Sequence, residues 1–476
     1  MLSGWLYLAL EWLLPIAMTP VVVRQHRRPF IAIAWLGCIF AFPPVGAPLY
    51  FVFSVFGIQR RREATLAVRR EYGGMLQERA HHGGISELPD RAREIASVGY
   101  AAHQRTAVQP LFAANEVTLL SDDEVVERLC ADIQSARNHV HLLFFIFAPD
   151  ETGRMVADAL VTAARNGCTC RVLVDAFGSR AMLKQLAPEL RRQGVAVVAM
   201  LRMRPLTRPL RRHDVRNHRK IAVIDGTVAY TGSSNIHGPE YDLEPGLGRW
   251  HQISARIAGP AVAALQTLFL EDWTLAADEK LAGSDIFPAA NRPGPTPVQV
   301  IADGPTYPDD AIQQVCIQAL NSARASVLLV SPYFVPDEPL IVALSCAALR
   351  GVNVRVLVPE RSDRRTADLA GRASWETLLQ AGVQILEHGR GVLHVKALVV
   401  DEESVLFGTA NLDRRSFFLN YELMLFLPDP RVARNLQSML RPFEQSSARV
   451  HLDEWRARAP GDRWRQDFAK LLSPLL

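Results

Sequence analysis

The sequence predicts an α/β protein of two similar halves, each a β-sheet layered with helices, preceded by an N-terminal transmembrane helical hairpin. Three observations predict this fold class. A pattern of His, Lys, Asp, Gly and Asn occurs twice at the same spacing, around His218 and His394. Apolar runs typical of strands alternate with helical segments in the same order in both halves. Residues 1–62 contain two long apolar stretches.

The repeated motif places the same kinds of polar group at one point in each half. Its members are, in chain order, His218, Lys220, Asp225, Ser233 and Asn235, and then His394, Lys396, Asp401, Thr409 and Asn411. Residues two apart on a strand face the same way, so each histidine should lie beside its lysine. The returning strand brings the hydroxyl and the amide back beside the imidazole. This set of imidazole, ammonium, hydroxyl and amide suits a phosphoryl group, because the nitrogen can attack phosphorus while the donors hold the oxygens.

The two motif aspartates have a different expected role. Asp225 and Asp401 lie seven residues after their histidines, so an unbent strand points them away from the histidine face. Gly226 follows Asp225, and this pair is typical of tight turns. Both aspartates belong to the candidate catalytic motif, but we expect them to fix the turn and the neighbouring backbone.

The repeat extends beyond the motif and sets the predicted domain limits. Strand-like runs at 140–147 and 171–174 correspond to runs at 327–335 and 355–358. Each half should therefore follow the order strand, helix, strand, helix, strand and motif hairpin. The predicted segments are a membrane hairpin at 1–62, a connector at 63–115, a first domain at 116–284, a linker at 285–298, a second domain at 299–450 and a C-terminal amphipathic tail at 451–476.

The N-terminal region has the composition of membrane segments. Leu2 to Val23 holds one charged residue and Phe30 to Ile58 holds none, so both stretches are long enough to cross a bilayer. Pro43, Pro44 and Pro48 interrupt the second stretch, which therefore either spans with a kink or dips in and returns. More arginines follow the second stretch than separate the two, which favours a cytoplasmic position for the globular part.

Composition narrows the functional classes. The formal net charge of +4 is too small to indicate a nucleic-acid partner by itself. The six cysteines form no Cys-x-x-Cys pair, which indicates a reduced compartment without structural zinc. Because Asp, Glu and His show no metal-ligand spacing, we expect neither a metal nor a cofactor.

The paired motif resembles the HKD signature of the phospholipase D superfamily, in which two domains related by a pseudo-two-fold axis face one cleft. Other segments resemble bacterial cardiolipin synthases, namely Arg216 to Lys220, Ser331 to Asp337, Asn411 to Ser416 and the two apolar stretches. This resemblance covers essentially the whole chain. It implies a transferase of the bacterial inner membrane, multi-pass, that joins two phosphatidylglycerol molecules into cardiolipin and releases glycerol. Its partners would be these lipids and an anionic membrane.

The resemblance also suggests roles for the site residues. His218 would attack phosphorus, and His394 would protonate the leaving glycerol and then deprotonate the acceptor hydroxyl. The groups expected to stabilise the phosphorane oxygens are Lys220, Lys396, Asn235 and Asn411.

In this superfamily, a carboxylate later in the chain orients each histidine. Glu422 matches that position for His394. Gln252 stands where an Asp is expected for His218. The alternative carboxylates near His218 are Glu240, Asp242 and Glu244.

Several alternatives remain at the sequence level. The motif also fits another phosphatidyltransferase, a hydrolytic phospholipase D or, less well, a membrane-tethered nuclease. The basic segment from Arg202 to Lys220 suits contact with anionic lipid. Gln466 to Leu476 suits either an interfacial helix or ordinary packing on the second domain. The sequence gives no indication of oligomeric state.

Overall fold

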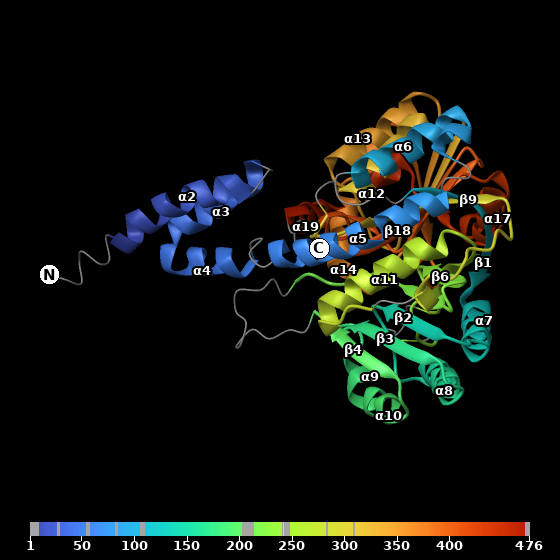
Figure 1. Ribbon diagram of the computed structural model, residues 1–476. Helices are drawn as coiled ribbons and strands as arrows, with labels where there is room; N and C mark the ends of the chain where they lie inside the picture. Colours follow the sequence, from blue (N-terminus) through green and yellow to red (C-terminus); the bar gives the residue numbers. More distant parts are fainter. Residues whose placement is uncertain are drawn as a thin grey trace.

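The computed structural model describes most of the chain, in several ranges. The described residues are 9–25, 29–53, 58–80, 84–104, 110–201, 214–239, 241, 248–281, 284–307 and 310–471. A globular body holds the two halves, and a group of N-terminal helices projects from one side of it (Figure 1). The basic segment is described only from Asp214 onward, and residues 202–213 lie outside the described ranges.

One 15-stranded sheet runs through both halves in the order β19-β13-β12-β10-β15-β16-β18-β9-β1-β8-β6-β5-β2-β3-β4. Its strands in the first half are β1 (Leu111–Ser121), β2 (His139–Phe144), β3 (Thr169–Asp175), β4 (Ala196–Met200), β5 (Ile221–Ile224), β6 (Val228–Gly232) and β8 (Ile253–Ala258). Those in the second half are β9 (Thr296–Asp303), β10 (Ser326–Val330), β12 (Asn353–Pro359), β13 (Gln384–His388), β15 (Ala397–Val400), β16 (Ser404–Gly408), β18 (Glu422–Leu427) and β19 (Ala448–Arg449).

Apart from the edge strand β19, the strand order is symmetric about the antiparallel pair β1–β9. Strands β2, β3 and β4 are parallel neighbours, and so are their counterparts β10, β12 and β13. The motif hairpins β5–β6 and β15–β16 are antiparallel and occupy equivalent places in the two halves. The expected mixed α/β architecture is therefore confirmed, with one sheet shared by both halves. Strand β9 begins at Thr296, inside the segment 285–298 that the sequence marked as a linker.

Helices cover both faces of this sheet, because successive strand residues point to opposite sides. On one face lie α5 (Ile58–Ala80), α11 (Val262–Ala277) and α17 (Pro430–Gln445). The other face carries, from the first half, α7 (Asp122–Gln134), α8 (Glu151–Arg165), α9 (Arg180–Gln185) and α10 (Ala187–Arg192). From the second half it carries α6 (Asp90–Gln104), α12 (Ala311–Ser322), α13 (Glu338–Leu349) and α15 (Trp375–Gln380). Figure 1 shows this layering.

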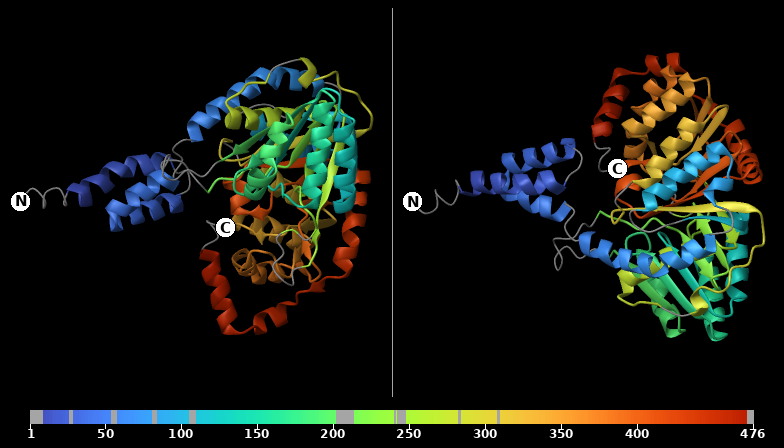
Figure 2. Two further views of the ribbon diagram at one scale, coloured as in Figure 1. Left: turned by 90° about the horizontal axis from the view of Figure 1, so that it is seen from below. Right: turned by 45° about the horizontal axis from the view of Figure 1, so that its top comes forward.

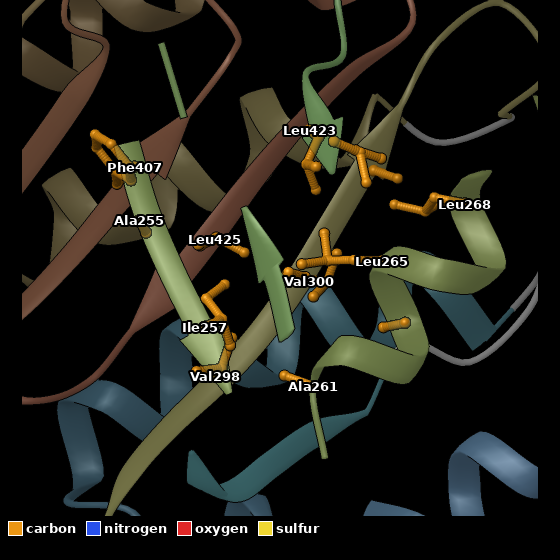
Figure 3. Close-up of a cluster of buried hydrophobic side chains, with 14 of the residues drawn as sticks. Ala255, Ile257, Ala261, Leu265, Leu268, Val298, Val300, Phe407, Leu423 and Leu425 are labelled. Carbon is orange, nitrogen blue, oxygen red and sulfur yellow. The ribbon is translucent and has the colours of Figure 1, made fainter. Parts of the chain in front are cut away.

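The core is continuous where the halves meet. Figure 3 shows side chains from β8, α11, β9, β16 and β18 packed together at the junction. The labelled members are Ala255, Ile257, Ala261, Leu265, Leu268, Val298, Val300, Phe407, Leu423 and Leu425. Because this apolar cluster contains strands of both halves, the two motif hairpins are held in a fixed mutual position.

The N-terminal helices are η1 (Ala9–Leu13), α2 (Leu14–Gln25), α3 (Pro29–Ala41) and α4 (Pro43–Phe53). The last three form an apolar cluster of their own. The second apolar stretch is broken at Phe42, before Pro43, as its prolines predict. Within the described ranges, no helix combines the length and the apolar character that a membrane crossing requires. The full transmembrane hairpin is therefore not confirmed.

Candidate active site

Each half-site begins just before a hairpin strand. His218 and Lys220 lead into β5, and His394 and Lys396 lead into β15. All four side chains are buried. Lys220 Nζ donates to the backbone oxygen of His218 at 2.8 Å, and Lys396 Nζ donates to that of His394 at 2.8 Å. Each ammonium is thereby fixed beside its own histidine, as the spacing of two predicts.

Backbone contacts between the halves hold both histidines at one junction. The amide of His218 donates to the carbonyl of Tyr421 at 2.9 Å, and the amide of His394 donates to the carbonyl of His251 at 2.8 Å. The second contact extends a small parallel pairing between β7 (Trp250–His251) and β14 (Val392–Leu393). Each histidine is therefore anchored by the half to which it does not belong.

These contacts determine which side chain faces each imidazole. Glu422 follows Tyr421, and its carboxylate oxygens lie 3.0 and 3.1 Å from His218 Nδ1. Gln252 follows His251, and its Oε1 lies 3.1 Å from His394 Nδ1. The sequence-based pairing of Glu422 with His394 and Gln252 with His218 is wrong, because the partners cross between the halves.

The crossed partners fix the same tautomer on both rings. An ionised carboxylate only accepts hydrogen bonds, so His218 donates through Nδ1 and its Nε2 carries the lone pair. Burial acts to raise the pKa of Glu422, but His218 and Lys220 hold it below its usual value. With the amide oxygen of Gln252 facing it, His394 likewise carries hydrogen on Nδ1. The Nε2 atom is therefore the unprotonated nitrogen of both neutral rings.

Burial controls the charges of the four motif bases. It lowers the pKa of His218 to about 4, against the opposing effect of Glu422. It also lowers the pKa of His394 well below its usual value, assisted by Lys396 and Lys220. For Lys220, burial lowers the pKa to about 7, and the pKa of Lys396 also lies well below its ordinary value. A bound phosphodiester anion would raise the pKa of all four groups, because it favours every protonated form.

The motif amides and hydroxyls have different roles. Ser233 Oγ exchanges hydrogen bonds with the backbone of Ile253 at 2.9 and 3.0 Å. Thr409 Oγ1 donates to Glu422 at 2.5 Å and accepts from the amide of Leu423 at 2.9 Å. These hydroxyls therefore brace the adjacent strands, so the expectation that they hold phosphate oxygens is wrong for this geometry.

The two asparagines remain available for an anion. Asn235 Oδ1 accepts a hydrogen bond from the amide of Ile146 at 3.2 Å. This contact uses the oxygen of the side-chain amide, so the Nδ2 hydrogens can donate to another acceptor. Asn411 is buried in the second half, and it is its Nδ2, not the acceptor Oδ1, that can donate to an anion. Together with Lys220 and Lys396, these side chains form the donor set that suits phosphoryl oxygens.

Asp225 and Asp401 act on the backbone, as their spacing predicts. The Asp225 carboxylate accepts from the amides of residues 137, 138 and 139 at 2.7–2.9 Å. Asp401 makes equivalent contacts with the amides of residues 324, 325 and 326 at 2.7–3.0 Å. Both aspartates have positive φ, 51° and 52°, which Asp tolerates better than most residues. Each therefore ties the motif turn to the start of a neighbouring strand.

Sequence reasoning missed three rings beside the histidines. Phe145 lies edge-on to His218, with centroids 5.1 Å apart, and Trp250 lies edge-on to His394 at 4.8 Å. His237 packs against Trp250 at 5.9 Å, and its buried Nε2 has no partner among the described residues. Phe145 and Trp250 fall in regions of strand-like pattern, where an aromatic residue is usually a core residue, so only the tertiary structure identifies them.

No group of three or more His, Cys, Asp or Glu side chains within the described ranges could hold a metal ion. Two symmetric half-sites, each with an imidazole and an ammonium over one shared sheet, define a phosphoryl-transfer protein of the phospholipase D type. The model of the family "Cardiolipin synthase, PLD-like domain" matches residues 129–250 and 316–443.

Relatives match the chain over nearly its full length. Cardiolipin synthase A of Pectobacterium atrosepticum is 33% identical over 481 residues, covering 99% of this chain and 98% of the relative. Cardiolipin synthase A of Proteus mirabilis is 33% identical over 493 residues, with the same coverage. This chain belongs to the cardiolipin synthase family of the phospholipase D superfamily. Among solved structures, phosphatidylserine synthase of Haemophilus influenzae shares the fold, with a TM-score of 0.60, 15% identity and coverage of 80% of this chain and 100% of its own.

Proposed function

We propose that this chain joins two phosphatidylglycerol molecules into cardiolipin and releases glycerol. Family membership over 99% of the chain supports this reaction, and the site supplies the groups that it needs. The observation that carries the proposal is the convergence of His218 and His394, each held by a backbone contact from the opposite half. Neither half alone contains a complete site.

The first step transfers a phosphatidyl group to the protein. His218 Nε2 attacks the phosphorus of the donor lipid, and the bond from phosphorus to the glycerol oxygen breaks. Protonated His394 gives its proton to that oxygen, and glycerol leaves. The bound phosphodiester anion raises the pKa of His394 and of both motif lysines, which restores the protonated forms. Glu422 stabilises the positive charge that develops on the phosphorylated His218 ring.

The second step transfers the same group to a second lipid. Neutral His394 removes the proton from the free glycerol hydroxyl of the acceptor, whose oxygen attacks phosphorus. The bond between phosphorus and His218 Nε2 breaks, and cardiolipin forms. Lys220, Lys396 and the two motif asparagines neutralise the phosphorane oxygens in both steps. His394 ends protonated, ready for the next donor.

Membrane attachment is part of the same proposal. The apolar N-terminal stretches hold the chain at the bacterial plasma membrane, and the arginines after them favour a cytoplasmic globular body. Phosphatidylglycerol and cardiolipin are then the partners of the site, within an anionic bilayer. Labelling of Cys346, which is exposed in the second half, by an impermeant thiol reagent in sealed inside-out and right-side-out vesicles tests this orientation.

The reaction itself is tested with phosphatidylglycerol as the only lipid. The purified chain should produce cardiolipin and glycerol in equal amounts, and His218→Ala and His394→Ala should each abolish both products. Phosphatidic acid in place of cardiolipin would instead identify a hydrolytic phospholipase D. DNA cleavage that is lost in His218→Ala, without lipid turnover, would identify a nuclease.

A further inference from the structure

We propose that the last helix, α19 (Pro460–Leu471), is an interfacial element that lies in the surface of an anionic bilayer beside the active site. This inference goes beyond the reaction proposed above and depends on it only in that the substrates are bilayer lipids. Its evidence comes from an exposed apolar face, the packing of the opposite face and the position of the helix in the fold.

Three large apolar side chains on α19 face solvent. Trp464 is 77% exposed, Phe468 63% and Leu471 73%. Their spacing of i, i+4 and i+7 places them in one stripe along the helix. Exposed apolar residues are common singly, but an aligned row containing two aromatic residues indicates a surface that contacts an apolar partner.

The body of the protein does not cover this stripe, because α19 packs through its other side. Gln466 and Ala469 are its buried residues. Ala469 contacts an apolar cluster with Val335, Ala367 and Ala370. In helical projection these buried positions lie opposite the row formed by the three exposed side chains. The helix is therefore fixed to the fold by one side, and its apolar row points outward.

This packing connects α19 to the second half-site. Ala367 and Ala370 belong to α14 (Arg365–Arg372), and Val335 belongs to β11 (Phe334–Val335). Strand β11 pairs in parallel with β17 (Leu412–Asp413), which directly follows Asn411 of the motif. Only the short helix α14 and the short strand pair β11–β17 therefore lie between α19 and the side-chain amide of Asn411.

Charge and position both indicate a bilayer as the partner. Arg465 lies on one side of the apolar row, and Arg463 and Lys470 lie on the other. With Asp462 and Asp467, the helix carries three cations and two anions, a small basic excess that suits an anionic interface. Trp464 suits the headgroup level, where indole rings concentrate. In Figures 1 and 2, α19 lies on the side of the body that faces α2, α3 and α4 in all three views. The same membrane can therefore reach both regions.

A fluorescent probe tests the contact without measuring turnover. Phe468→Cys carries an environment-sensitive dye in the full chain, reconstituted in phosphatidylglycerol nanodiscs holding one chain each. Ser438→Cys, at an exposed position on α17 at the opposite end of the body in Figure 1, is the matched control. The cysteines that are not buried, Cys38, Cys130 and Cys346, are replaced by Ser in both proteins.

The dye at position 468 should emit at shorter wavelength and resist aqueous iodide, whereas the dye at position 438 should remain quenched. Equal quenching at both positions would overturn the proposal. Shielding at position 468 that appears only when a nanodisc holds two chains would also overturn it, because the row would then be a contact between copies. Either result leaves cardiolipin synthesis itself intact, since the readout does not depend on catalysis.

A second measurement links the contact to function. Turnover of phosphatidylglycerol in vesicles, divided by turnover of dispersed short-chain phosphatidylglycerol, should fall about tenfold in Trp464→Ser/Phe468→Ser, because the tethered site no longer meets the surface in a fixed orientation. Arg434→Ser/Ser438→Ala on α17 should leave the ratio unchanged. An equal loss with both substrates would mean that the two side chains serve only packing, and the proposal would fail.

Discussion

The carboxylate of Glu422 lies 3.0 Å from Nδ1 of His218, although 204 residues separate them and they belong to opposite halves. The symmetric contact, His394 with Gln252, replaces the carboxylate with an amide at 3.1 Å. The site therefore has two-fold geometry but unequal chemistry. One imidazole has a partner that stabilises positive charge, and the other has a partner that only orients it.

Replacing Glu422 with Gln should slow the formation of phosphatidyl-His218. The variant keeps an acceptor beside Nδ1 but loses a charge-assisted hydrogen bond, which is worth about 1.5–3 kcal/mol. This loss corresponds to a decrease of about 10- to 100-fold in the rate of glycerol release in a single turnover. Rapid-quench measurement of glycerol and of covalently bound lipid checks this expectation.

The location of the covalent lipid distinguishes the roles of the two histidines. Peptide mapping of the quenched protein should find the label on His218, with less of it in Glu422→Gln. Label on His394 in both proteins would reverse the assignment of nucleophile and acid. A variant that releases glycerol at the original rate would remove Glu422 from the mechanism.

Gln252→Glu should make the second half-site resemble the first. A carboxylate 3.1 Å from His394 would raise the pKa of that imidazole, which now lies well below its usual value because of burial and the neighbouring lysines. If His394 acts as the acid, the alkaline limb of kcat/KM should move upward by about one pH unit. An unchanged profile, with wild-type folding by circular dichroism, would contradict this role. Gln252→Met, which removes the acceptor without adding charge, is the control.

The sequence predicted the parts of this site that depend on local geometry. A spacing of two residues places His218 beside Lys220, and the turn at Asp225 follows from strand geometry and a hairpin dipeptide. The crossing of Glu422 to the opposite half was not predictable, because it depends on backbone pairing between residues far apart in the chain. Ser233 is a similar case. Its hydroxyl could bind phosphate, but it hydrogen-bonds the backbone of Ile253 in the neighbouring strand, and the local sequence does not predict that contact.

The fold shows the same division. Repeated strand and helix patterns predicted two equivalent halves, because the spacing of apolar residues in a segment shows which of its own side chains are buried. That β1 and β9 join them into one sheet could not be deduced from either half alone. The break before Pro43 was predictable because proline lacks an amide hydrogen.

Asp225→Ala should reduce stability while leaving the chemistry of folded molecules intact. The carboxylate accepts three backbone hydrogen bonds, and their loss should cost about 2–4 kcal/mol of the free energy of unfolding. Asp225→Asn keeps a neutral acceptor and tolerates the positive φ, so it should cost less, about 1 kcal/mol. Thermal unfolding gives the stabilities, and active-site titration gives kcat per folded molecule. A stable Asn variant with greatly reduced kcat would show that the aspartate acts in catalysis.

The affinity of the empty site for phosphodiesters should fall as pH rises through about 7, the pKa to which burial lowers Lys220. Below this pH the ammonium attracts the anion, and above it the neutral amine does not. Stability should change in the opposite direction. Because the folded protein binds fewer protons than the unfolded chain between pH 7 and 10.5, the free energy of unfolding of the empty protein should increase with pH in this interval.

Competition by a non-cleavable phosphatidylglycerol analogue at pH 6 and pH 9 measures the first effect, and thermal unfolding over the same range measures the second. Lys220→Met should lose part of both pH dependences, and the remainder should come from Lys396, whose pKa is also strongly lowered by burial. Analogue affinity that is equal at pH 6 and pH 9 in the unsubstituted protein would mean that both lysines stay charged in the empty site. Burial would then not control the charge of this anion-binding centre.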